Sequence, residues 1–134
     1  MKDEKYSVTF VFHKVCIIFA KNNNNMHNKN ADNQIERIRV TLTNVLPKGS
    51  AAWLYGSRAR GDSRVNSDWD ILVVVDKERL TFKDYSAITY PLTELGWDMG
   101  EEINPVMYTR QEWDENVNTP FRDNVERDAI LLVS

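Results

Sequence analysis

The sequence predicts an α/β (α+β) protein with one small mixed β-sheet flanked by helices. Two observations support this fold class. Amphipathic helical segments alternate with short apolar strands along the chain, and 134 residues with 42% apolar content suffice for one hydrophobic core but not for two. The content of 28% charged residues is typical of a globular protein. The net charge of −3 makes nucleic acid an improbable main partner, because proteins that coat it usually carry a basic excess.

Residues 1–30 differ in composition from the rest, and we expect a disordered or over-extended N-terminus ahead of a domain at 31–134. The apolar stretch at 6–20 is too short and too interrupted to span a membrane, and it makes a poor signal peptide. The asparagine run at 22–25 is typical of a linker, and we expect the true start at Met26 directly after it. The alternative is an extra edge strand.

The first half of the expected domain contains one helix and two strands. Asn33 and Glu36 have the spacing of a capping box, and the helix should end before Pro47. An apolar strand is expected at 51–55, and a turn with glycine and arginine precedes a buried strand at 68–75. The apolar positions that share one face of the helix are Ile35, Ile38, Leu42 and Val45.

The second half begins with another amphipathic helix, bent or restarted at Pro91. A strand at 102–108 contains Pro105, which indicates an edge strand or a bulge. A short helix is expected at 109–116, a further helix starts at Thr119-Pro120, and a short strand at 130–133 ends the chain. The apolar face of the amphipathic helix comprises Phe82, Tyr85, Ile88, Leu92 and Leu95.

The cysteine, the histidines, the acidic residues and the tryptophans narrow the range of possible functions. Cys16 is the single cysteine, so no internal disulfide can form, which suits a cytoplasmic protein. His13 and His27 lie outside the expected domain and are not predicted to be catalytic. Residues 98–134 are strongly acidic, which indicates either a solvated surface or one that docks a basic partner. The tryptophans are interpreted as core residues: Trp53, Trp69, Trp97 and Trp113.

Asp68 and Asp70 stand two residues apart at the head of an apolar strand. Side chains alternate along a strand, so both carboxylates leave one face, and Trp69 and Ile71 leave the other. Two carboxylates on one face can share a hard cation, and magnesium commonly binds one or two carboxylates together with substrate phosphates. The pair therefore predicts a magnesium site that a triphosphate completes.

The turn before this strand offers groups that can bind phosphates. Gly56 lets the backbone approach a ligand closely. Ser57 supplies a hydroxyl and an amide at the start of an expected helical turn, where anions are favoured. The candidates for pairing with phosphate oxygens are Arg58, Arg60 and Arg64.

The motif within residues 56–71 resembles the signature of the nucleotidyltransferase superfamily typified by polymerase beta, and most closely that of its smallest members, the minimal nucleotidyltransferases (MNT). The resemblance rests on Gly56-Ser57, Arg60-Gly61 and Ser67-Asp68-Trp69-Asp70-Ile71, and a looser likeness runs from Ile35 to the C-terminus. It implies the polymerase beta-like nucleotidyltransferase fold, with Mg²⁺ and a nucleoside triphosphate such as ATP as substrate.

The resemblance also implies roles and partners. Asp68 and Asp70 would hold the metal, and Gly56, Ser57, Arg58 and Arg60 would bind the nucleotide. The reaction would transfer AMP to a protein or small-molecule acceptor. Some members inactivate a HEPN-type toxin in this way, and others modify small molecules such as aminoglycosides. Little of the chain is left to recognise an acceptor, so a partner protein or a second copy is expected to supply part of that surface.

The family uses a third carboxylate on the next core strand, where this sequence departs from the pattern. Asn104 occupies the position that we align with it. Glu102 lies one pleat earlier on the same face, and we predict that it is the third catalytic carboxylate, while Glu101 faces the opposite way. Asn104 and the acidic last third favour an alternative: a catalytically impaired protein that acts as a binding or masking antitoxin module.

Overall fold

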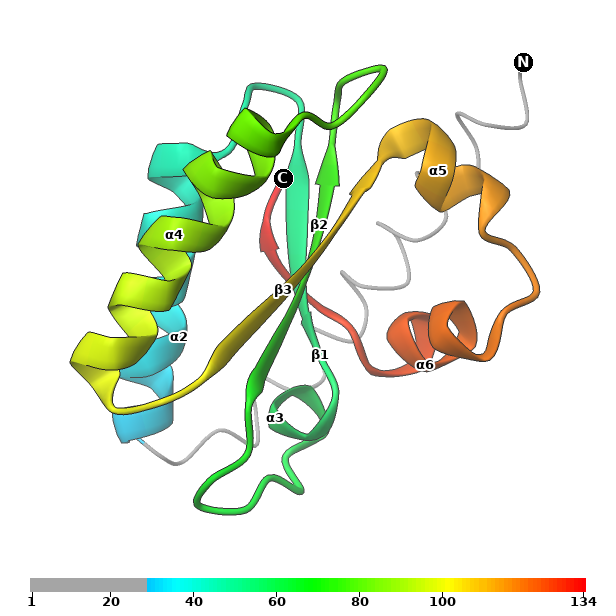
Figure 1. The fold of residues 1–134 in the computed structure, drawn as a ribbon. Coiled ribbons are helices and arrows are strands. Elements are labelled where there is room, and N and C mark those ends of the chain that lie inside the picture. The colour runs from blue at the N-terminus through cyan, green and yellow to red at the C-terminus, as the bar shows by residue number, and fades with distance from the viewer. Residues whose placement is uncertain (1–28) are drawn as a thin grey trace.

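A mixed four-stranded sheet forms the centre of the protein, with helices on both of its faces (Figure 1). The computed structural model describes residues 29–134, so the expectations for residues 1–28 lie outside the described part. The strand order is β3-β2-β1-β4, with β1 antiparallel to β2 and to β4, and β2 parallel to β3. This confirms the predicted fold class. The strands are β1 (Ala51–Tyr55), β2 (Trp69–Val75), β3 (Ile103–Thr109) and β4 (Ile130–Val133), each within one residue of its expected bounds.

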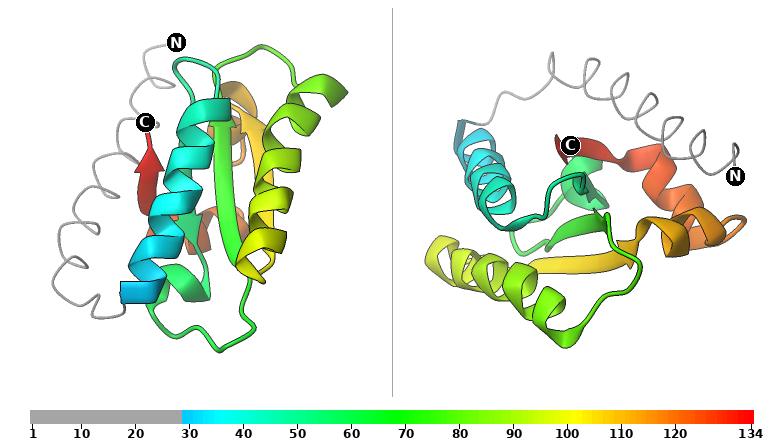
Figure 2. Two further views of the ribbon diagram at one scale, coloured as in Figure 1. Left: turned by 90° about the vertical axis from the view of Figure 1, so that its left-hand side faces the viewer. Right: turned by 90° about the horizontal axis from the view of Figure 1, so that it is seen from above.

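Two long helices, α2 (Lys29–Val45) and α4 (Phe82–Met99), cover one face of the sheet side by side (Figure 2). Their apolar faces pack on alternate residues of β2, because successive side chains of a strand point to opposite faces. No helix within residues 29–134 combines the length and the apolar content needed to cross a membrane. The largest side chains of this core include Ile38, Leu42, Trp69, Ile71, Ile88 and Leu92.

Three details of these helices differ from the prediction. Helix α2 begins at Lys29 rather than at Asn33, whose exposed side chain lies within the helix. Helix α4 continues through Pro91, because buried residues on both sides of the proline anchor it to the sheet. Phe82 and Tyr85 are exposed instead of buried. The 3.6-residue repeat places Phe82 about 80° or more around the helix from the buried Ile88 and Leu92, so it lies on the outer face.

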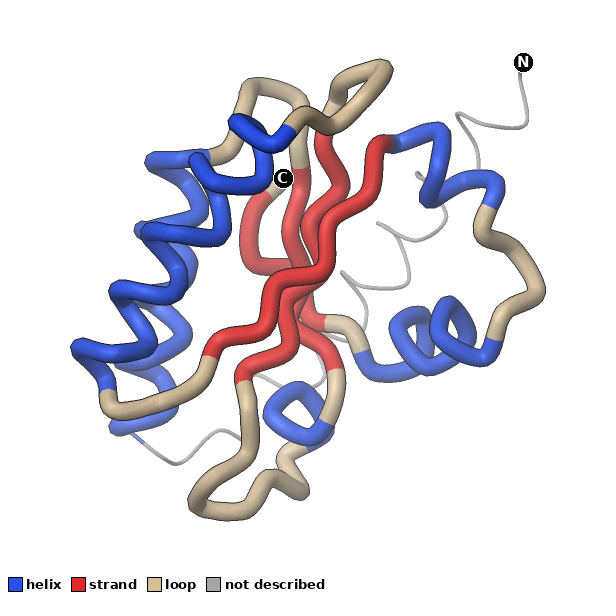
Figure 3. Tube along the Cα trace, in the orientation of Figure 1, coloured by secondary structure: helices blue, strands red, loops and turns tan. Residues whose placement is uncertain are grey.

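The opposite face of the sheet carries two short helices, α5 (Arg110–Glu115) and α6 (Pro120–Asp128), as Figure 3 also shows. Thr119 caps α6 by accepting a hydrogen bond from the Arg122 amide, and Pro120 follows at the first helical position, as predicted. The second core lies beneath these helices and includes Trp53, Leu72, Val74, Trp113 and Val125. Three of the four predicted core tryptophans are therefore buried, but Trp97 on α4 is 72% exposed.

Strand β3 forms one edge of the sheet, as its proline predicted. The Trp69 amide donates to the Glu102 carbonyl, so the even-numbered residues of β3 bond towards β2. Pro105, which has no N–H, consequently faces the free edge, where no ladder hydrogen bond is lost. The short helix α3 (Ser57–Arg60) follows β1 and lies beneath the sheet in Figure 1.

Candidate active site

One row of side chains runs across the three strands β1, β2 and β3. Asp70 lies opposite Tyr55 on β1 and opposite Asn104 on β3. Trp53 and Leu72, one pleat further along, belong to the core under α5 and α6, so this row faces the same side. The structure thus brings together residues from three separate parts of the chain.

Asp68 and Asp70 leave the same face, while Trp69 and Ile71 are buried on the other. The Asp68 Oδ2 atom accepts a hydrogen bond from Asn104 Nδ2 at 2.9 Å. Among residues 29–134, the Asp70 carboxylate has neither a hydrogen bond nor an ion pair. Burial and the negative charge of Asp68 raise the pKa of Asp70, and the charge of Arg60 opposes this shift.

Gly56 ends β1 against the carboxylate of Asp70. Its φ of 76° and ψ of −158° lie in a region that almost only glycine adopts. A Cβ atom at this position would come within 2.5 Å of Asp70 Oδ2. The next residue back, Tyr55, has its pKa raised to about 12 by burial, by Asp70 and by Tyr108, so its hydroxyl stays protonated at neutral pH.

Ser57 is the first residue of α3, and no side chain of the described residues caps this helix. Arg60, at the end of α3, is held in place by two carboxylates. Its Nη1 atom lies 2.8 Å from Asp128 Oδ2, and its Nε atom lies 3.1 Å from Asp62 Oδ2. Burial opposes ionisation of Asp128, but hydrogen bonds from Arg127 and Arg60 outweigh it and lower the pKa of this carboxyl. Sequence reasoning did not identify Asp128, because no local pattern relates it to α3.

Arg58 has a different environment from that expected of a phosphate ligand. Its guanidinium donates to the Ser67 carbonyl and to Glu101 Oε2, the latter at 2.8 Å. It also lies over the Trp69 ring, 4.7 Å from the centroid. The side chain is only 13% exposed. These contacts tie the loop before β2 to the turn before β3, so Arg58 positions the chain beside Asp68.

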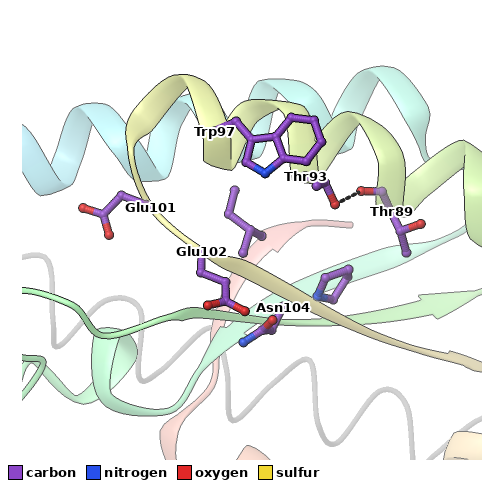
Figure 4. Close-up of a pocket in the computed structure, with 8 residues that line it drawn as sticks. Thr89, Thr93, Trp97, Glu101, Glu102 and Asn104 are labelled. Carbon is purple, nitrogen blue, oxygen red and sulfur yellow. Dashed lines mark hydrogen bonds between the residues drawn. The ribbon is translucent and has the colours of Figure 1, made fainter.

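The structure also gives new information about two further residues, Glu101 and Arg64. Glu101 points away from Glu102, as Figure 4 shows. It has structural contacts of its own, because it accepts hydrogen bonds from both Arg58 and Gln34. Arg64 is exposed, and its backbone amide donates to Ser67 Oγ at 2.7 Å. That contact closes the turn immediately before Asp68.

Glu102 and Asn104 point to the same side of β3 (Figure 4). The register places Asn104, rather than Glu102, directly beside Asp70. Within residues 29–134, no three or more Asp, Glu, His or Cys side chains form a group that could hold a metal ion, so Glu102 is not clustered with the two aspartates. Its role as third carboxylate stays a prediction.

The donor set of Asp68 and Asp70 nevertheless fits magnesium. Both groups are carboxylates. Burial first, and then the charge of Asp68, disfavour ionisation of Asp70 and raise its pKa, and a divalent cation would offset both effects. The amide oxygen of Asn104 offers a neutral ligand on the same side.

The sequence comparison identifies the family. Residues 33–134 match the family described as polymerase beta, nucleotidyltransferase. The chain belongs to this nucleotidyltransferase family. No curated protein matches the sequence.

Two solved structures resemble this nucleotidyltransferase. One is a toxin–antitoxin crystallised with AMP-PNP, with 22% identity, a TM-score of 0.52, and coverage of 75% of this chain and 70% of that one. The other is a candidate nucleotidyltransferase from Sulfolobus solfataricus, with 21% identity, a TM-score of 0.46, and coverage of 80% and 89% respectively. At 22% identity, the first likeness establishes a shared fold alone.

The contact between Gly56 and Asp70 gives a first prediction. Gly56→Ala should lower the free energy of unfolding by about 3 kcal/mol, because the alanine adopts a glycine-only conformation and its Cβ overlaps the carboxylate. Gly61→Ala is the control: Gly61 also has a positive φ, of 82°, but its Cβ would meet nothing within 4 Å, so only about 1 kcal/mol should be lost. Urea denaturation measures both. Asp70→Ala should recover part of the Gly56→Ala loss, and no recovery would mean that the overlap is relieved elsewhere.

The raised pKa of Asp70 gives a second prediction. Unfolding returns Asp70 to its ordinary, lower pKa, so stability falls as the pH rises through the folded-state pKa. Without divalent cations, Asp70→Asn should therefore raise the melting temperature at pH 7 by a few degrees, and the gain should shrink as the pH approaches about 3.9. Magnesium should raise the melting temperature of the natural protein but not of the variant. Equal responses to magnesium would remove Asp70 from the metal site.

Proposed function

We propose that this protein transfers AMP from ATP to a hydroxyl of an acceptor in a magnesium-dependent reaction, and that the acceptor is a partner protein such as a HEPN-type toxin. Family membership supports the reaction class. The fold shared with the toxin–antitoxin structure that contains AMP-PNP supports the choice of nucleotide and partner. The observation that carries the proposal is the half-buried Asp70 carboxylate, unpaired within residues 29–134 and beside Asp68.

The reaction is a displacement at the α-phosphorus. The acceptor oxygen forms a bond to this phosphorus, and the bond to the oxygen that bridges the α- and β-phosphates breaks. AMP is then joined to the acceptor, pyrophosphate leaves, and the hydroxyl proton passes to a carboxylate. Bound magnesium would supply positive charge that offsets the charge on the phosphates.

Different strands and loops of the described chain would supply the metal ligands, the phosphate ligands and the positioning residues. Asp68 and Asp70 would hold the metal. The Ser57 hydroxyl and the uncapped amides at the start of α3 would hold the phosphates, with Arg60 anchored beside them by Asp128. Arg58 would act by positioning the loop that carries Asp68, since its guanidinium is already engaged. Catalysis would then consist of positioning and charge neutralisation.

A second function has a specific observation in its favour. Asn104 stands beside Asp70 and donates to Asp68, where the family pattern has a carboxylate. Such a protein could mask a toxin without catalysis. Titration with ATP and magnesium separates the two functions, because a pure masking module need not bind the nucleotide.

The proposed reaction predicts that Asp68→Asn and Asp70→Asn each reduce AMP transfer about 100-fold or more, because each removes a charge that holds the metal. Labelled ATP, magnesium and the product of the neighbouring gene are incubated together, and intact mass reports AMP addition. Asp76→Asn is the control: it changes the same residue type at the other end of β2, where the carboxylate is exposed. Wild-type turnover in both site variants would contradict the proposal.

The third carboxylate is tested separately. Glu102→Gln should lower transfer by at least about tenfold if this carboxylate accepts the acceptor proton. Asn104→Asp restores the family pattern, and it should raise transfer if the natural protein is impaired. A silent Glu102→Gln together with a strong gain from Asn104→Asp would show that our assignment of Glu102 is wrong. Glu101→Gln is not a neutral control, because Glu101 binds Arg58.

A further inference from the structure

The outer face of α4 carries large aromatic side chains that pack against nothing in the described core. Phe82 is 86% exposed, Tyr90 is 59% exposed and Trp97 is 72% exposed. Their spacing of eight and seven residues places them along one stripe of the helix. Large apolar side chains that gather on one exposed face of a helix are typical of a binding surface.

Two surface depressions follow this stripe. Both are open to the surface. One is lined by α4 residues alone, among them Phe82 and Tyr90, and the other is lined by Trp97 and the start of β3. Thr89 and Thr93 line both, so the two depressions are adjacent. We call them together the α4–β3 groove. It extends from Phe82 at one end to Glu102 and Asn104 at the other.

The groove crosses the free edge of β3 and reaches the candidate active site. Figure 4 shows Trp97 and Thr93 on the α4 side of β3, with Glu102 and Asn104 pointing together to the other side. Asn104 lines the groove and also donates to Asp68. A molecule in the groove would therefore lie next to the proposed metal-binding carboxylates.

The direction of the proposed reaction makes this the acceptor side. Attacking and leaving oxygens lie roughly in line across a transferring phosphorus. In the proposed function the phosphates lie at Ser57, after β1, and the metal lies at β2. The leaving pyrophosphate is then on the β1 side, and the acceptor must approach from the side of β3, where the groove ends.

The charge of the groove indicates what it binds. At the end near β3 the charged lining residues are Glu101 and Glu102, both acidic. Glu101 is paired with Arg58, whereas the exposed Glu102 carboxylate has no partner within residues 29–134. Since Trp97 and Glu102 lie on opposite sides of the β3 edge, a long basic side chain that crosses this edge would pack its stem against Trp97 and reach the Glu102 carboxylate with its charge. The basic lining residue, Lys83, lies at the opposite end.

We propose that the α4–β3 groove binds an extended segment of a protein partner. An arginine or lysine of this segment would cross the β3 edge from Trp97 to Glu102, and apolar side chains would lie against Tyr90 and Phe82. The segment would present the acceptor hydroxyl to Asp68 and Asp70; this last point alone rests on the proposed function. Phe82 and Trp97 are about 22 Å apart along the helix, from the rise of 1.5 Å per residue. That distance suits about seven residues of extended chain.

Trp97 provides a direct measurement. Trp53, Trp69 and Trp113 are each 1% exposed, so quenching of tryptophan fluorescence by acrylamide reports almost entirely on Trp97. The probe is a fluorescein-labelled octapeptide with two leucines at one end, serines in the middle and two arginines at the other end. We expect the unlabelled peptide to protect Trp97 from acrylamide. In fluorescence anisotropy, Trp97→Ala should weaken binding of the labelled peptide about tenfold, and Trp97→Phe should weaken it less.

Matched controls make the outcome decisive. Val117→Ala alters another half-exposed apolar residue away from the groove, and it should leave binding unchanged. The same peptide with citrulline in place of arginine should not bind, because it lacks the charge. Binding is measured without ATP and magnesium, so that this test does not depend on AMP transfer.

Several results would overturn the proposal. These are absence of peptide binding, equal affinity for the citrulline peptide, or unchanged affinity of Trp97→Ala. Sedimentation of the protein alone tests the other occupant. A dimer that Trp97→Ala dissociates would show that a second copy fills the groove.

Discussion

Strand β2 pairs with an antiparallel neighbour on one side and a parallel one on the other, and the candidate active site depends on this register. The pairing sets Asp70 between Tyr55 and Asn104. A shift of one residue would turn Asp70 into the core beneath α2 and α4 and would expose Ile71. The apolar residues that hold β2 in place therefore also hold both carboxylates on the face of the proposed active site.

The candidate site contains an unfavourable interaction between like charges, and the packing of the surrounding fold keeps these charges together. Asp68 and Asp70 repel each other, and Asp70 is pressed against the backbone of Gly56, a position where no side chain fits. Such an arrangement costs stability when no cation is bound, and it is maintained because the surrounding core determines the backbone. The same repulsion favours binding of a divalent cation, so the cost in stability and the proposed function have one physical origin.

The arginines of the motif have separate tasks, although the sequence presents them as equivalent. Arg58 is largely buried and joins Ser67 to Glu101, so it orders the two loops that flank the site. Arg60 remains 41% exposed and is held by Asp128, so its charge is available near Asp70. On the other side of β3, the exposed Trp97 and the acidic end of the groove would contact the proposed partner segment.

The sequence by itself determined the order and bounds of the strands and the common face of Asp68 and Asp70, because apolar periodicity and strand alternation are local properties. The family motif could also be identified from the sequence, since its residues lie close together in the chain. Only the tertiary structure decided that Arg58 binds Glu101, 43 residues away, and that Trp97 faces solvent. Apolar side chains line more than one face of α4, and periodicity locates those faces without deciding which of them packs on the sheet. That choice is made by the shape and spacing of the partner elements, which no local pattern contains.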